Sequence, residues 1–105
     1  MKYFLTLIFC VPLSLWAAES EYKLVIQNHS FQPAELIIPA QQKVKLVIEN
    51  RDNSVEEFES HALNREKIIP AQKSATIYIG PLKPGRYPFF GEYNQKTAQG
   101  VIIVQ

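Results

Sequence analysis

The stretch RYPFFGEYNQKTAQGVIIV (residues 86–104) joins two apolar segments through a polar loop. Aromatic residues fill the first segment as far as Phe90, and Gly100 opens the second, which is a run of aliphatic residues. Aromatic and β-branched residues favour strands. The loop between them, GEYNQKTAQ, contains no cysteine, histidine or methionine. The stretch therefore predicts a strand, a loop and a final strand.

The rest of the chain repeats this pattern of short apolar segments separated by turn residues. In residues 43–50, apolar side chains alternate with lysine and glutamate, which is typical of a strand with one buried face. No segment keeps a 3.6-residue apolar period, so we expect no substantial helix. The pattern predicts an all-β sandwich of about seven to eight mostly antiparallel strands. The expected strands are residues 22–27, 34–39, 43–50, 55–61, 66–70, 74–80, 86–90 and 100–104.

The first 18 residues have the features of a secretory signal peptide. Lys2 supplies the positive charge, residues 3–16 form a short apolar run, and Ala17 and Ala18 are the small residues before the cleavage point. We therefore expect residues 1–18 to be cleaved and residues 19–105 to form one domain in the periplasm. After cleavage we expect no direct insertion into the membrane.

Composition excludes several classes of function. The signal peptide carries the only cysteine, Cys10, so residues 19–105 have neither a thiolate nor a disulfide. The chain has 11 Lys+Arg against 10 Asp+Glu, and this balance predicts no nucleic-acid partner. No hydrolase, zinc-protease or phosphate-loop motif is present. We therefore expect no enzyme, except that a bound metal would permit oxidation of ferrous iron.

Four stretches of the chain resemble the cupredoxin-like family: FQPAELIIPAQQKVKLVIEN (31–50), EEFESHALNREKIIPAQ (56–72), IGPLKPGRYPFF (79–90) and GVIIV (100–104). The resemblance implies a cupredoxin-like Greek-key β-sandwich. The second stretch, together with GPLKPGRYPFFGE, is similar to the small periplasmic cupredoxin-like proteins of the EfeO type, which accompany iron permeases in bacterial iron uptake. It implies that the partner is an iron permease or its periplasmic partner protein.

The same resemblance places the ligands of a type 1 copper site in this sequence. The first histidine falls at Glu56, the cysteine at Gly91, the second histidine at Asn94 and the methionine at about Ala98. A type 1 site requires a thiolate ligand. We therefore expect no blue-copper site and no type 1 electron transfer.

Other residues are candidates for a different metal site. Glu56 has the strand parity of Phe58, which points it inward, and Glu92 and His29 lie in loops that the fold resemblance places at the same end. Such a cluster, with Glu57 close by, is rich in oxygen ligands and suits iron or manganese better than Cu(I).

His61 is the fifth candidate ligand. It shares the strand parity of Glu57 and Glu59, opposite Phe58, which favours a surface position. For all five candidates the simpler interpretation is a solvated acidic face and exposed histidines.

Three functions remain open. The first is a periplasmic accessory protein of an iron-uptake system that binds or delivers iron, or assists ferrous iron oxidation, through carboxylates and histidine. The second is a metal-free β-sandwich that docks to a membrane partner. The third is a copper chaperone that uses His29 and His61 with oxygen ligands at a site that is not blue copper.

Overall fold

The computed structural model describes residues 20–105, and the predicted signal peptide lies outside this range. The described part is all-β, with nine strands in two sheets and no helix, which confirms the predicted fold class. The strands are β1 (Ser20–Gln27), β2 (Ser30–Gln32), β3 (Glu35–Ile38), β4 (Val44–Asn50), β5 (Glu56–Ser60), β6 (Arg65–Ile69), β7 (Ser74–Ile79), β8 (Gly85–Gly91) and β9 (Gln99–Val104).

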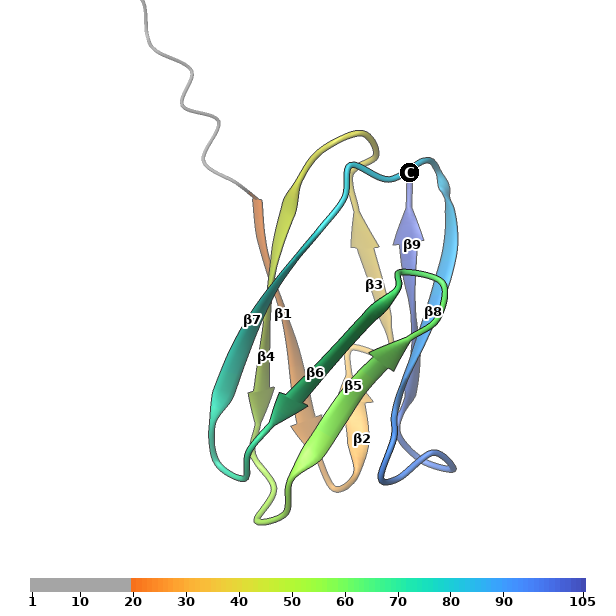
Figure 1. Cartoon of the computed structure of the whole chain (residues 1–105). Coiled ribbons are helices and arrows are strands. Elements are labelled where there is room, and N and C mark those ends of the chain that lie inside the picture. The colour runs from red at the N-terminus through yellow and green to blue at the C-terminus, as the bar shows by residue number, and fades with distance from the viewer. Residues whose placement is uncertain (1–19) are drawn as a thin grey trace, which may run out of the picture.

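The two sheets pack face to face as a sandwich (Figure 1). One has the order β2-β1-β4-β7 and the other the order β3-β9-β8-β5-β6. The pairs β1–β4 and β3–β9 are parallel, and the remaining pairs are antiparallel. The β5–β6 hairpin forms one edge of the second sheet, and four of the five residues of β6 are exposed.

The core lies between the sheets and is built from alternate residues of each strand. Phe58 and Phe89 stack with ring centroids 5.1 Å apart, and Phe31 meets Phe89 edge-on at 4.9 Å. Such aromatic contacts add to the stabilisation from buried area. Because Phe58 faces this core, its neighbours on β5 face outward.

Strand β2 is the one element that the sequence pattern did not predict. It pairs with the end of β1 through Ile26 and Phe31, and a two-residue turn at Asn28 and His29 joins the strands. Both turn residues have positive φ, 53° and 58°, as a tight hairpin turn requires. The sequence predicted a loop at His29, but the loop lacks the Asn-Gly pair that usually marks a hairpin, so the short strand after it was not predicted.

Asn50, at the end of β4, holds the loop that leads into β5. It is 1% exposed, and its side-chain amide donates to the carbonyls of Ser54 (2.9 Å) and Ile69 (3.0 Å). Its side-chain oxygen accepts from the amide of Asp52 at 3.0 Å.

We expect Asn50→Ala to lower the free energy of unfolding by about 2 kcal/mol, because it leaves the buried carbonyl of Ile69 without its donor. Urea denaturation measures this loss. A change below the error of that measurement would show that water replaces the amide.

Candidate functional site

Glu56, which the resemblance places at the position of a copper-binding histidine, is a buried hydrogen-bond acceptor. It begins β5, points inward as its parity with Phe58 predicted, and is 1% exposed. One carboxylate oxygen accepts from the backbone amides of Glu57 and Tyr93, both at 2.9 Å. The other accepts from the side-chain amide of Asn94 at 2.7 Å. The carboxylate therefore joins the start of β5 to the loop after β8.

Gly91, at the end of β8, lies against the Glu56 carboxylate and has no room for a side chain. A Cβ atom there would lie 2.7 Å from the Glu56 carboxylate carbon and 2.7 Å from the Cβ of Ala98. Ala98, at the methionine position, is itself fully buried. The residues at the copper-ligand positions therefore do not fit a type 1 copper ion, because they supply neither a thiolate nor an imidazole and already fill the space.

His29 lies in the β1–β2 turn, and its imidazole lies beside Asp52. The Asp52 carboxylate accepts from the backbone amides of Asn28 (2.8 Å) and His29 (3.0 Å), and lies 3.6 Å from His29 Nδ1. The Thr97 hydroxyl donates to the His29 carbonyl, so the turn does approach the loop after β8. The imidazole lies beside Asp52, whereas the Glu56 carboxylate is hydrogen-bonded to Glu57, Tyr93 and Asn94.

A group of three carboxylates lies on the outer face of the β5–β6 hairpin. Glu57 and Glu59 alternate with Glu56, Phe58 and Ser60 along β5, and the strand register places Glu66 of β6 opposite Glu59. Each offers an oxygen within 4.8 Å of the others, and no other such group exists within residues 20–105. We call Glu57, Glu59 and Glu66 the outer carboxylate cluster. The structure does not bring the predicted ligands Glu56, Glu92 and His29 together into one such group.

Two further predicted residues border this cluster. His61 Nδ1 lies 3.9 Å from a Glu59 oxygen, and its ring is 5.6 Å from that of Phe90. The outer carboxylate cluster lies in a surface depression that His61 and Glu92 also line. The backbone amide of Glu92 donates to the Glu57 carbonyl at 2.9 Å. His29 lines other depressions, so the structure does not bring the two histidines to one site.

Negative charge is concentrated at the cluster. Glu59 is 9% exposed, and burial raises its pKa, with repulsion from Glu66 and Glu57 adding to the effect. The exposed His61 offsets this repulsion only in part. Burial and the neighbouring Glu57 also raise the pKa of Tyr93. A bound cation would compensate this crowded charge.

Replacing Glu59 by glutamine should raise the unfolding temperature of the metal-free protein at neutral pH. Because its pKa is raised in the folded state, the folded protein holds that proton more tightly than the unfolded chain does. The ionised form therefore costs stability, and this cost disappears as the pH falls below the ordinary glutamate range. Thermal unfolding at several pH values should show a gain that shrinks with acidity, whereas a lower unfolding temperature at neutral pH would contradict it.

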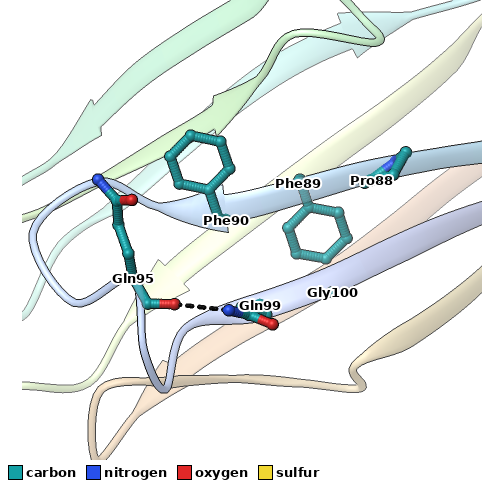
Figure 2. Close-up of a pocket in the computed structure, with 6 residues that line it drawn as sticks. All are labelled: Pro88, Phe89, Phe90, Gln95, Gln99 and Gly100. Atoms are coloured by element: carbon teal, nitrogen blue, oxygen red, sulfur yellow. Dashed lines mark hydrogen bonds between the residues drawn. The ribbon is translucent and has the colours of Figure 1, made fainter.

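A groove runs along β8 and β9 (Figure 2). Phe90 and Gln95 line both the groove and the depression of the outer carboxylate cluster. The Gln95 carbonyl accepts from the Gln99 side-chain amide at 2.8 Å, which holds the loop over β9. The groove is therefore continuous with the depression of the outer carboxylate cluster, and Pro88 and Phe89 add apolar surface to it.

Within the described part of the chain, no helix has the length and apolar character needed to cross a membrane.

The sequence matches the family of cupredoxin-like domains over residues 2–104. The chain belongs to this family. It is 49% identical over 84 residues to an uncharacterised protein, RP394, of Rickettsia prowazekii (strain Madrid E), with 80% of this chain and 67% of that protein covered. The predicted cupredoxin-like relationship is therefore confirmed.

Solved structures show the same fold at low sequence identity. Auracyanin A, a "blue" copper protein from Chloroflexus aurantiacus, superposes with a TM-score of 0.72 and 11% identity, covering 84% of this chain and all of that one (100%). The metal-binding domain of the Cu(I)-exporting P-type ATPase CopA of Streptococcus pneumoniae D39, solved with Cu(I), superposes with a TM-score of 0.72 and 15% identity. The match covers 81% of this chain and 84% of that one. These similarities establish the β-sandwich scaffold of the domain.

Proposed function

We propose that this protein is a periplasmic cupredoxin-like accessory protein that binds ferrous iron at the outer carboxylate cluster and delivers it within an iron-uptake system. The observation that carries the proposal is the approach of three carboxylate oxygens to within 4.8 Å of one another around the largely buried Glu59. Like charges in such proximity are costly unless a cation lies between them.

The ligand types favour iron or manganese over copper. The cluster offers oxygen ligands with one adjacent imidazole, His61, and hard or borderline divalent ions prefer this set. Cu(I) prefers thiolate and thioether sulfur, which residues 19–105 do not contain.

The position of the cluster favours delivery over catalysis. It lies on the outer face of an edge hairpin, and Glu66 is exposed. A partner can therefore reach the bound ion directly and exchange ligands with it. Ile68 of the hairpin and Tyr93 of the loop after β8, which are 54% and 52% exposed, offer apolar contacts to such a partner. The identity of the partner, an iron permease or its periplasmic partner protein, rests on the resemblance of residues 56–72.

Two other functions have an observation in their favour. The closed copper-ligand end, filled by Glu56, favours a metal-free docking module. The copper proteins among the structural relatives favour copper at a site that is not blue copper, although His29 and His61 line separate depressions.

Anaerobic calorimetry of the exported protein with Fe(II), Mn(II) and Cu(II) separates the three. We expect Fe(II) and Mn(II) to bind with one site per chain and micromolar dissociation constants. The absence of binding tighter than millimolar for all three ions would overturn the proposal in favour of the docking module. Tight Cu(II) binding that His61→Ala and His29→Ala abolish, without Fe(II) binding, would overturn it in favour of copper.

A further inference from the structure

We propose that Glu56 is a positioning residue whose carboxylate replaces a metal ion as the link between β5 and the loop after β8. The copper-ligand positions of the family are in contact here, but the contact is a set of hydrogen bonds. Glu56 meets Asn94 at 2.7 Å, and Gly91 leaves the space that the carboxylate occupies. The protein thus keeps the cross-link of the scaffold without the ion.

The geometry of Glu56 fits this role. Its three partners are all N–H donors: the amides of Glu57 and Tyr93, and the side chain of Asn94. Hydrogen bonds to a carboxylate are stronger than those between neutral groups. Because the side chain is 1% exposed, water does not compete for these donors.

The link has a consequence on the opposite side of the sheet. Glu56 fixes Tyr93 and Asn94, while the preceding residue, Glu92, is tied through its amide to the Glu57 carbonyl. Tyr93 and Asn94 themselves line the depression beside His29, and they lie between Glu92 and Gln95, which line the depression of the outer carboxylate cluster. In this respect the inference rests on the proposed function: Glu56, which faces inward, positions the loop that borders the proposed metal site on the outer face.

A reversal of the hydrogen bond tests the link. Asn94→Asp places a carboxylate against the Glu56 carboxylate and should break the contact. Adding Glu56→Gln should restore it, because the glutamine oxygen still accepts from the amides of Glu57 and Tyr93 while its NH₂ group donates to the carboxylate introduced by Asn94→Asp. The double variant also has the net charge of the wild type. Glu35→Gln, on the exposed side of β3, is the control for loss of a carboxylate.

Two measurements read the result. Amide hydrogen exchange at Tyr93 should become about tenfold faster or more in Asn94→Asp and return towards the wild-type rate in the double variant. Mn(II) affinity should fall several-fold in Asn94→Asp although the variant has gained a negative charge, and should recover in the double variant. A purely electrostatic role would give tighter Mn(II) binding in Asn94→Asp.

The outcomes separate this proposal from the proposed function. A double variant no better than Asn94→Asp in exchange at Tyr93, or Asn94→Asp with wild-type exchange, would overturn the link. Recovery of exchange together with no Mn(II) binding by the wild-type protein would support the link and overturn the metal site. Recovery of exchange with Mn(II) affinity unaffected in every variant would overturn the positioning role of Glu56.

Discussion

Replacing Gly91 by alanine is expected to lower the free energy of unfolding by about 3 kcal/mol, at the upper end of the usual cost of overpacking. The added methyl group would lie 2.7 Å from both the Glu56 carboxylate and Ala98, and both of these residues are buried. Urea denaturation measures the loss. Gly85→Ala in the same strand is the matched control, since its nearest neighbour would be 3.6 Å away, an ordinary contact.

The cost should be smaller when Glu56 is already alanine, because one of the two clashes is then removed. The clash with Ala98 remains, so the cost should not vanish. Equal losses from Gly91→Ala in the two backgrounds would contradict the packing of Glu56 against Gly91. A Gly91→Ala protein as stable as Gly85→Ala would contradict the closed copper-ligand end itself.

The double variant Glu57→Gln/Glu66→Gln should weaken Fe(II) and Mn(II) binding by about 100-fold or more, because it removes two of three carboxylate ligands. Stability should be retained, since Glu66 is exposed and Glu57 only half-buried. Anaerobic calorimetry gives the affinity and thermal unfolding the stability.

Glu35→Gln, on a different strand, should leave the affinity unchanged and serves as the control for loss of a carboxylate away from the cluster. A loss of affinity of the same size in Glu35→Gln would show that binding depends on general negative charge. An unchanged affinity in Glu57→Gln/Glu66→Gln would contradict the assignment of the cluster.

The fold could be predicted because strand alternation is a local property of the sequence. The pattern in residues 43–50 corresponds to β4, with its alternate residues buried, and residues 86–104 form β8, a loop and β9 as expected. Strand β2 was missed because its turn uses Asn28 and His29 at positive φ and gives no glycine signal. The parallel pairing of β1 with β4 joins residues far apart in the chain, and no local pattern records it.

The candidate site could be predicted only in part, because it depends on register and on backbone groups. Parity correctly placed Glu56 inward and Glu57 and His61 outward. It could not show that the partners of Glu56 include a backbone amide from a loop 37 residues away. Glu59 and Glu66 were not among the predicted ligands, because the position of Glu66 opposite Glu59 depends on the length of the HALN turn.

The relation to copper proteins lies in the scaffold and not in the ligands. The residues that the resemblance places at the copper-ligand positions are Glu56, Gly91, Asn94 and Ala98, and they are closely packed and hydrogen-bonded. The metal chemistry that we propose lies instead on the outer face of the second sheet. The predicted export, iron-uptake role and partner remain predictions.

The most direct measurement is an anomalous difference map from a crystal of residues 19–105 grown with Mn(II). The account predicts one manganese peak on the outer face of the β5–β6 hairpin, coordinated by carboxylate oxygens of Glu57, Glu59 and Glu66. A peak instead between Glu56, Gly91 and Asn94, or no peak at a Mn(II) concentration far above the dissociation constant expected from calorimetry, would contradict it.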